Sequence, residues 1–234
     1  MPSRSIKLPA VDRKRAILVS AAPVFARLGR AGATTKEIAK AAGISEALLY
    51  KHFPGKEALY AELERHCVDA HAVGDRIFNG ATPSTATLVM GVAMLVEAVF
   101  SGIGPRQMHE DTKRLVTSSL LDDGRLAKAF LDRHVKPSIG LLENALQAAR
   151  AAGDVEEGAS TGKAEIWFVH HLANTLHLIS LSGAEIVDYG LTQPELTEST
   201  VRFLLRGLGL KNLAINRHYD PKELRNTFAQ IDRK

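Results

Sequence analysis

The sequence of 234 residues contains one cysteine, few aromatic residues and no long uninterrupted apolar run. Because Cys67 is the only cysteine, no disulfide can form within the chain, and a reducing compartment is the simpler expectation. Aromatic residues make up 6% of the chain, which argues against a large aromatic cage for bulky cations. The longest apolar stretches, near residues 88–103 and 166–181, are interrupted by Gly, Glu, His or Asn, so we expect no membrane span.

Patterns typical of catalysis and cofactor binding are also missing. No serine lies in a nucleophile-elbow pattern, and Gly102 and Gly104 lack the strand-turn-helix context of a dinucleotide fingerprint. His66, Cys67 and His71 are a possible cluster of metal ligands, since Cys67 and His71 are one turn apart. Two ligands do not make a metal site, so a solvated helix face is the favoured interpretation. We therefore expect no enzyme activity, no cofactor and no bound metal.

Positive charge is concentrated near the N-terminus. The net charge is +4, yet residues 1–71 hold 12 Lys and Arg against 7 Asp and Glu, whereas residues 72–234 hold 18 against 19. This asymmetry is typical of a segment that contacts phosphates. Residues 1–11 are expected to form a flexible basic arm that touches DNA, or simply a disordered tail. They contain no apolar run of signal-peptide length, so we expect a cytoplasmic protein.

Residues 34–59 have the pattern of a helix-turn-helix. Thr34 is placed to cap a first helix, and Glu37 stands three residues later, where a capping-box Glu reaches back. Gly43 follows the last helical residue, where the backbone often needs a positive φ. Ser45 can then cap a second short helix.

The second helix of this motif is expected over residues 46–52 and ends before Pro54. Leu48 or Leu49 should face the core, which leaves Tyr50 and its polar neighbours outward. A helix of this size and exposure can enter the major groove of DNA. An ordinary helical hairpin within a core is the alternative, but the caps, the glycine turn and the exposed polar run together favour DNA binding.

The run AGISEALLYKHFPGKEAL resembles the DNA-binding signature of the TetR family of bacterial transcriptional regulators, and the resemblance covers roughly residues 12–70. It implies an all-helical homodimer with an N-terminal DNA-binding domain and a C-terminal domain for ligand binding and dimerisation. Carried over position by position, it implies DNA contacts at Thr35, Lys36, Ser45, Glu46, Ala47, Leu48, Tyr50, Lys51, His52 and Lys56. Many members carry Gly-Thr where this chain has Ala47-Leu48. Leu48 offers no hydroxyl and either packs inward or touches a thymine methyl.

The predicted fold class is all-α, with a three-helix helix-turn-helix domain followed by a C-terminal helical bundle. The division is an arm over 1–11, a DNA-binding domain over 12–54, a connecting helix over 55–78 and a ligand-binding and dimerisation domain over 79–234. Helices are expected over residues 12–28, 35–42, 46–52, 54–76, 83–101, 106–121, 123–152, 159–181, 194–208 and 221–231. Pro23 should bend the first of these, and Pro137 should kink the long one.

Polar and large apolar side chains of the C-terminal helices are the candidates for a ligand pocket. They are Met90, Met94, Phe100, Met108, Phe130, His134, Trp167, His170, His171 and Asn174. The Met, Phe and Trp residues suit an adaptable apolar cavity or plain core. The histidines, His177 included, suit an anionic or aromatic ligand, or hydrogen bonds in a dimer interface.

The resemblance places dimerisation on the last two long helices. Their apolar side chains exceed what one bundle face needs, and the expected interface residues are Phe168, Leu172, Leu176, Ile179, Phe203 and Leu204. The alternative is that all six belong to the intrachain core.

Together these features predict a ligand-responsive DNA-binding regulator, a repressor released from a palindromic operator by a small-molecule effector. The expected partners are double-stranded operator DNA, the effector and a second copy of the chain, with no membrane. The alternatives are a helical small-molecule binding protein or enzyme with a vestigial helix-turn-helix, and a DNA-coating protein without sequence preference.

Overall fold

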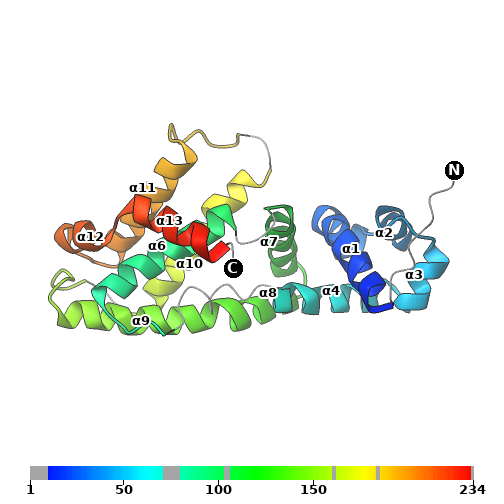
Figure 1. The fold of residues 1–234 in the computed structure, drawn as a ribbon, viewed down its shortest axis with the longest axis horizontal. Helices are drawn as coiled ribbons and strands as arrows, with labels where there is room; N and C mark the ends of the chain where they lie inside the picture. Colours follow the sequence, from blue (N-terminus) through cyan, green and yellow to red (C-terminus); the bar gives the residue numbers. More distant parts are fainter. Residues whose placement is uncertain (1–9, 71–79, 103–105, 160–161, 183–184, 233–234) are drawn as a thin grey trace. The chain divides into compact units, whose positions relative to one another are not determined.

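The computed structural model describes residues 10–70, 80–102, 106–159, 162–182 and 185–232, and its regular elements there are helices (Figure 1). They are α1 (Ala10–Gly32), α2 (Thr35–Ala41), α3 (Glu46–His52), α4 (Lys56–Ala70), α6 (Thr85–Ser101), α7 (Arg106–Leu120), α8 (Arg125–Phe130), the π-helical turn η1 (Leu131–Val135), α9 (Lys136–Ala151), α10 (Lys163–Ser180), α11 (Gln193–Gly207), α12 (Asn212–His218) and α13 (Pro221–Asp232). The predicted all-α class is confirmed. The expected arm over 1–11 falls almost wholly outside the described residues.

The chain forms two compact units. Unit 1 comprises Met1–His71 and Asp111–Phe130, and unit 2 comprises Ala72–Glu110 and Leu131–Lys234. The sequence-based division placed all of 79–234 in one C-terminal domain, whereas most of α7 and all of α8 pack with the N-terminal helices. The physical reason is that Leu115 and Leu126 lie in the core of unit 1, with 1% of each exposed.

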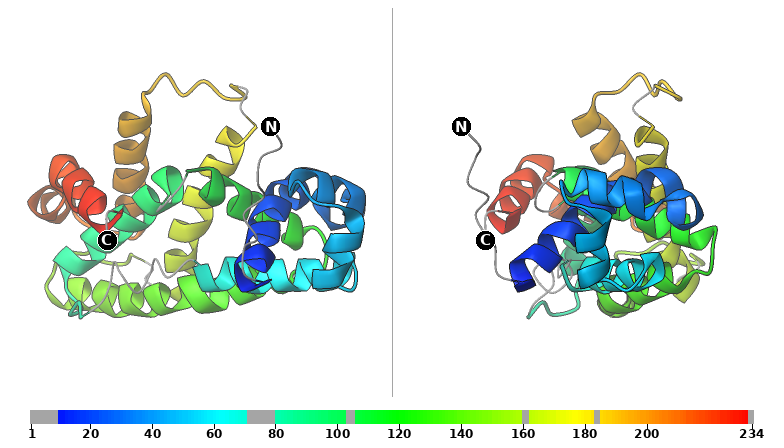
Figure 2. Two further views of the ribbon diagram at one scale, coloured as in Figure 1. Left: turned by 45° about the vertical axis from the view of Figure 1, so that its right-hand side comes forward. Right: turned by 90° about the vertical axis from the view of Figure 1, so that its right-hand side faces the viewer.

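Helix α1 lies against α2 and α4 in unit 1 (Figure 2), and the core of the unit is built on one face of α1. Ile17, Ala21 and Phe25 recur at helical spacing and are buried, and the Phe25 ring meets Tyr60 of α4 edge-on with centroids 5.0 Å apart. The irregular backbone of α1 lies at Gly29, whose φ of 69° breaks the helix, rather than at the expected Pro23. Pro23 is exposed on the far side of the helix from this core.

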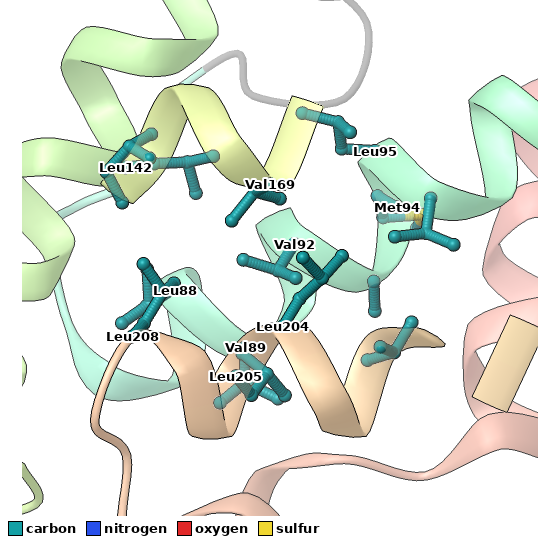
Figure 3. Packing of buried hydrophobic residues seen from close by; sticks show 14 of the residues in the cluster. Leu88, Val89, Val92, Met94, Leu95, Leu142, Val169, Leu204, Leu205 and Leu208 are labelled. Carbon is teal, nitrogen blue, oxygen red and sulfur yellow. The ribbon is translucent and has the colours of Figure 1, made fainter. Parts of the chain in front are cut away.

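Unit 2 is organised around α6, which lies between α9 and α11 and also packs against α10, α12 and α13 (Figures 1 and 2). Leu88, Val89 and Val92 of α6 have no exposed surface. Figure 3 shows Leu88 beside Leu208, the C-cap of α11, and Val89 beside Leu205 of α11. Because partners surround it, α6 is apolar on almost every side, whereas a surface helix carries only an apolar stripe.

The long helix predicted over 123–152 is interrupted. Its first part is α8, its last part is α9, and the π-helical turn η1 lies between them. Pro137 sits in the first turn of α9, where its missing N–H is tolerated. A proline cannot donate to the carbonyl one turn before it, and a widened π turn is one way to absorb that missing bond. The sequence thus predicted that the helix is irregular near Pro137, but it predicted a kink rather than a π-helical turn.

Helix α12 was not predicted from the sequence. It has seven residues, too few for a periodic pattern, and follows the break at Gly209. An isolated antiparallel bridge joins Val155 to Leu210 just before it, and Ala214 and Ile215 then bury against the core. Tertiary packing therefore stabilises a helix that is too short to be stable alone.

Among the helices that the structure describes, none is long and apolar enough to cross a membrane.

We expect Gly102→Ala to destabilise unit 2 strongly. Gly102 ends α6 with a φ of +75°, and a Cβ there would lie 2.6 Å from Cγ of the buried His109. The expected cost is about 1–2 kcal/mol for the left-handed backbone and about 1–3 kcal/mol for overpacking. Urea denaturation followed by the fluorescence of Trp167, the only tryptophan, measures it.

The matched control for this variant is Gly153→Ala. Gly153 has the same φ of +75° but nothing within 4 Å of an added Cβ, so only the backbone term applies. Equal losses of unfolding free energy in the two variants would show that His109 does not constrain the turn.

Candidate functional site

The first helix of the motif begins with the predicted capping box. The hydroxyl of Thr34 accepts a hydrogen bond from the Glu37 amide at 3.2 Å, and the Glu37 carboxylate accepts one from the Thr34 amide at 3.1 Å. The same hydroxyl also donates to the carboxylate and lowers the pKa of Glu37. These bonds fix the start of α2, so the position of Thr35 and Lys36 follows from local sequence.

The turn between α2 and α3 is equally determined by local sequence. Gly43 adopts a φ of +64°, and the amide of Ile44 donates to the carbonyl of Ala39 at 3.0 Å. Ser45 then accepts from the Leu48 amide at 3.2 Å and caps α3. A capping hydroxyl keeps its own hydrogen, so Ser45 can still donate to a phosphate.

Helix α3 exposes four of its seven residues. Leu49, with 2% exposed, is its buried residue, and Phe53 anchors the end of the helix at 3%. Four predicted DNA contacts, Glu46, Ala47, Tyr50 and Lys51, are exposed, while Leu48 and His52 are partly buried. Leu49 is thus the core-facing leucine of the pair that the sequence left open.

Three of the predicted contacts form a hydrogen-bonded group that joins α2 to α3. The Thr35 hydroxyl donates to the Glu46 carboxylate at 3.0 Å, and the Tyr50 hydroxyl lies 3.3 Å from the same Thr35 oxygen. Since the Thr35 hydrogen is directed at Glu46, Tyr50 is the donor in the second contact. The group holds polar atoms of both helices on one exposed surface.

Lys56 is placed differently from the other predicted contacts. It is the first residue of α4, and its ammonium donates to the carbonyl of Ala31 at 3.2 Å. This bond ties α4 to the end of α1. An ammonium has three donors, so two remain for phosphate oxygens.

Arg30 is a positioning residue that sequence reasoning missed. Its guanidinium donates to Glu57 of α4 at 2.8 Å and to Asp123, before α8, at 3.0 Å, and it lies over the Tyr60 ring at 5.4 Å. Asp122 lies 3.6 Å away. The partners are 27 and 93 residues distant in the sequence, so no local pattern signals this contact. It connects three segments of unit 1 near the start of α4.

The predicted ligand-pocket residues are not all brought together. Phe130 belongs to unit 1, whereas the others with described side chains belong to unit 2. The side chain of Met108 lies outside the described part of the chain. Met94 is core with 5% exposed, and Met90 and Phe100 pack against that core partly buried. His134 is buried within η1.

Aromatic and imidazole rings do gather along α10. Trp167 stacks on His171 with centroids 5.6 Å apart and meets His170 edge-on at 6.0 Å. Farther along the helix, the His177 ring lies 5.4 Å from His109 and 6.5 Å from Phe100. Asn174 donates to the backbone carbonyl of His170 at 2.8 Å. The ring row along α10 thus consists of two groups, one around Trp167 and one around His177, and the second includes Phe100 of α6 and His109 of α7.

The predicted dimer residues divide by exposure. Phe168 of α10 and Phe203 of α11 are 60% and 64% exposed, which is unusual for phenylalanine. Leu172, Leu176 and Ile179 are partly buried. Leu204 is 6% exposed and packs into the core of unit 2 against α6, so it has little surface to offer a partner.

The residues described contain no group of three or more His, Cys, Asp or Glu side chains arranged to hold a metal ion. Cys67 is buried, and this burial raises the pKa of its thiol to about 12, which disfavours the thiolate that binds metals.

Residues 17–63 match the family model described as bacterial regulatory proteins, tetR family. The HTH-type transcriptional activator FasR of Mycolicibacterium smegmatis is 42% identical over 64 residues, which are 27% of this chain and 29% of FasR. The HTH-type transcriptional regulator RutR of Escherichia coli K12 is 40% identical over 57 residues, 24% of this chain and 27% of RutR. The match therefore spans less than a third of each of these relatives.

Similarity of fold extends over most of the chain. AibR, solved in complex with isovaleryl coenzyme A and operator DNA, has a TM-score of 0.58 at 20% identity, covering 85% of this chain and all of AibR. A putative TetR-family transcriptional regulator from Rhodococcus sp. has a TM-score of 0.54 at 20% identity, covering 84% of this chain and 97% of that protein. With the capped helix-turn-helix and the family match over residues 17–63, the N-terminal part of this chain belongs to the TetR family of bacterial regulatory proteins, and the rest of the chain shares the fold of the solved structures above.

Proposed function

We propose that this protein is a ligand-responsive transcriptional regulator that binds a palindromic operator as a homodimer and is released by a small-molecule effector. The observation that carries the proposal is α3, a capped helix anchored by Leu49 with its remaining polar face exposed. The protein would act by binding rather than by catalysis, in the cytoplasm where its operator lies.

The exposed surface of α2 and α3 has the chemistry that duplex DNA requires. Lys36 and Lys51 are exposed cations suited to phosphates, and Ser45 supplies a hydroxyl donor. The Tyr50 hydroxyl would donate to DNA in place of Thr35. Glu46 presents a carboxylate that can accept from a cytosine amino group in the major groove. The proposed base reading thus depends on Glu46 and Ala47, with phosphate contacts on both sides.

We expect Lys51→Ala to weaken DNA binding equally for all sequences and to lower the slope of log affinity against log salt by about 1. Fluorescence anisotropy at several salt concentrations measures both, with DNA recovered by selection from a random duplex pool. Lys222→Ala, which removes an exposed lysine of α13, is the control and should leave affinity unchanged.

The selection step separates a regulator from a DNA-coating protein. A regulator enriches a near-palindromic sequence with half-sites about one helical turn (~34–36 Å) apart. Recovery of DNA without an enriched sequence would contradict the proposed function. Equal losses of DNA affinity in Lys51→Ala and Lys222→Ala would contradict the proposed DNA surface.

The proposed homodimer uses α10 and α11. Phe168 and Phe203 expose large apolar rings on α10 and α11 of unit 2. A two-fold partner covering these rings would remove them from water and would also place two copies of α3 for two half-sites.

We expect Phe203→Glu to shift the protein from dimer to monomer and to weaken operator binding by about tenfold or more, since a charge would be buried without a partner. Size-exclusion chromatography with light scattering measures the mass. Leu121→Glu, at an 87% exposed position of unit 1, is the control and should leave the mass unchanged. A wild-type protein that remains monomeric at all concentrations would refute the dimer.

The effector is proposed to bind in unit 2 near the rings along α10. AibR has been solved with both an acyl coenzyme A and operator DNA, so one protein of this fold holds an effector-sized ligand together with DNA. In this chain Trp167, His170 and His171 offer stacking surfaces and hydrogen-bonding nitrogens for an aromatic or anionic ligand.

A compound that releases the operator is therefore expected to change the fluorescence of Trp167, the only tryptophan of the chain. The two signals, anisotropy of labelled DNA and tryptophan emission, should have the same half-saturating concentration. Release of DNA with unchanged emission would place the effector elsewhere.

A further inference from the structure

A small pocket lined by apolar surface and several charged side chains opens in unit 2 where α6, α11, the end of α12 and α13 meet. Its volume is about 160 Å³, close to that of a cavity of ~150 Å³ that holds benzene. Glu97 and Ser101 line it from the end of α6, and Glu198 lines it from α11. Tyr219 lines it from the C-cap of α12, and Arg225 from the first half of α13. None of these residues belongs to the ring row on α10 or to the DNA surface of α3.

Tyr219 is the residue that distinguishes this pocket from an ordinary surface depression. Its side chain is buried with 5% exposed, and its hydroxyl is buried without a hydrogen-bond partner in the described part of the chain. Leaving such a group unpaired costs free energy unless a ligand or water completes the bond. Burial raises the pKa of the phenol to about 12, so the hydroxyl remains a donor.

The ring of Tyr219 is held in place from one side. The guanidinium of Arg202 lies 5.3 Å from the ring centroid. That guanidinium is fixed in turn by Glu198 at 2.9 Å and by Asn216 at 3.0 Å. This contact restricts rotation of the Tyr219 ring, which lines the pocket.

Two carboxylates face the pocket with bonding capacity left. Glu97 accepts from the Ser101 hydroxyl at 2.6 Å through one oxygen, and Glu198 accepts from Arg202 through one oxygen. Each has a second oxygen that can accept from an ammonium group. Arg225 contributes a cation from an exposed position on the pocket lining.

We propose that this pocket binds a small zwitterion of the amino-acid class. The ligand's ammonium group lies between Glu97 and Glu198, and its carboxylate accepts from Tyr219 and Arg225. Both ends then meet an opposite charge or a donor, and the buried hydroxyl gains its missing partner. The pocket's size admits a short chain between the two charged ends. The site does not depend on DNA binding, so its failure would leave the proposed regulator function intact.

The test is isothermal titration calorimetry of the full chain with glycine, β-alanine, γ-aminobutyrate and 5-aminovalerate, and with propylamine and propionate as single-charge controls. We expect at least one zwitterion to bind saturably with a Kd of ~1 mM or lower, at least about tenfold tighter than either control. Glu97→Gln should weaken that binding by about tenfold or more.

Tyr219→Phe separates a ligand site from a structural role. The variant should weaken zwitterion binding by about fivefold or more, yet leave the thermal midpoint of the free protein unchanged or raised, because it removes an unpaired buried hydroxyl. Tyr189→Phe, at a 40% exposed position, is the matched control and should change neither quantity. The fluorescence emission of Trp167 checks that each variant is folded. If Glu97→Gln does not fold, the binding measured for Tyr219→Phe still tests the proposal.

Three results would overturn the proposal. They are absence of saturable binding for every zwitterion, equal affinity for propylamine alone, and undiminished binding by Tyr219→Phe. The first or third result would mean that water fills the pocket or that the zwitterion binds elsewhere, and the second would mean that the site recognises only a cation.

Discussion

The orientation of α3 depends on the burial of Leu49. A helix of seven residues is not stable alone in water, so it forms here because one leucine and the neighbouring Phe53 pack into the core of unit 1 while Ser45 caps its start. The packing of Leu49 and Phe53 therefore sets the position of every side chain that α3 exposes toward DNA. Because a single side chain is buried, the remaining positions of α3 are free to carry chemistry rather than packing.

Polar contacts refine this arrangement from the neighbouring helices. Thr35 connects the start of α2 to Glu46 and Tyr50 on α3, and Arg30 connects the end of α1 to α4 and to the segment before α8. Such contacts add little stability when exposed, but they fix direction, which matters for a surface that must match a groove. Helices α7 and α8 therefore support the motif although they follow it by many residues.

Unit 2 separates stability from recognition in a different way. Its core surrounds α6 with aliphatic side chains that are almost completely buried. The rings of α10 and the charged groups near Tyr219 supply stacking and polar surfaces instead. The ring row along α10 and the pocket around Tyr219 have different chemistry: stacking surfaces in the first, opposed charges in the second. A helical bundle of this kind can bind a small molecule at more than one place, because neither place requires a change in the aliphatic core around α6.

The sequence by itself determined the features that depend on near neighbours. Thr34, Glu37, Gly43 and Ser45 specify caps and a turn through bonds within a few residues, and periodic apolar positions specify most helices. Only the tertiary structure decided that most of α7 and all of α8 pack with unit 1, that Leu204 belongs to the core, and that Tyr219 shares a pocket with charged groups from three other helices. Those outcomes depend on residues far apart in the chain, and a single sequence carries no local signal for which distant side chains will meet.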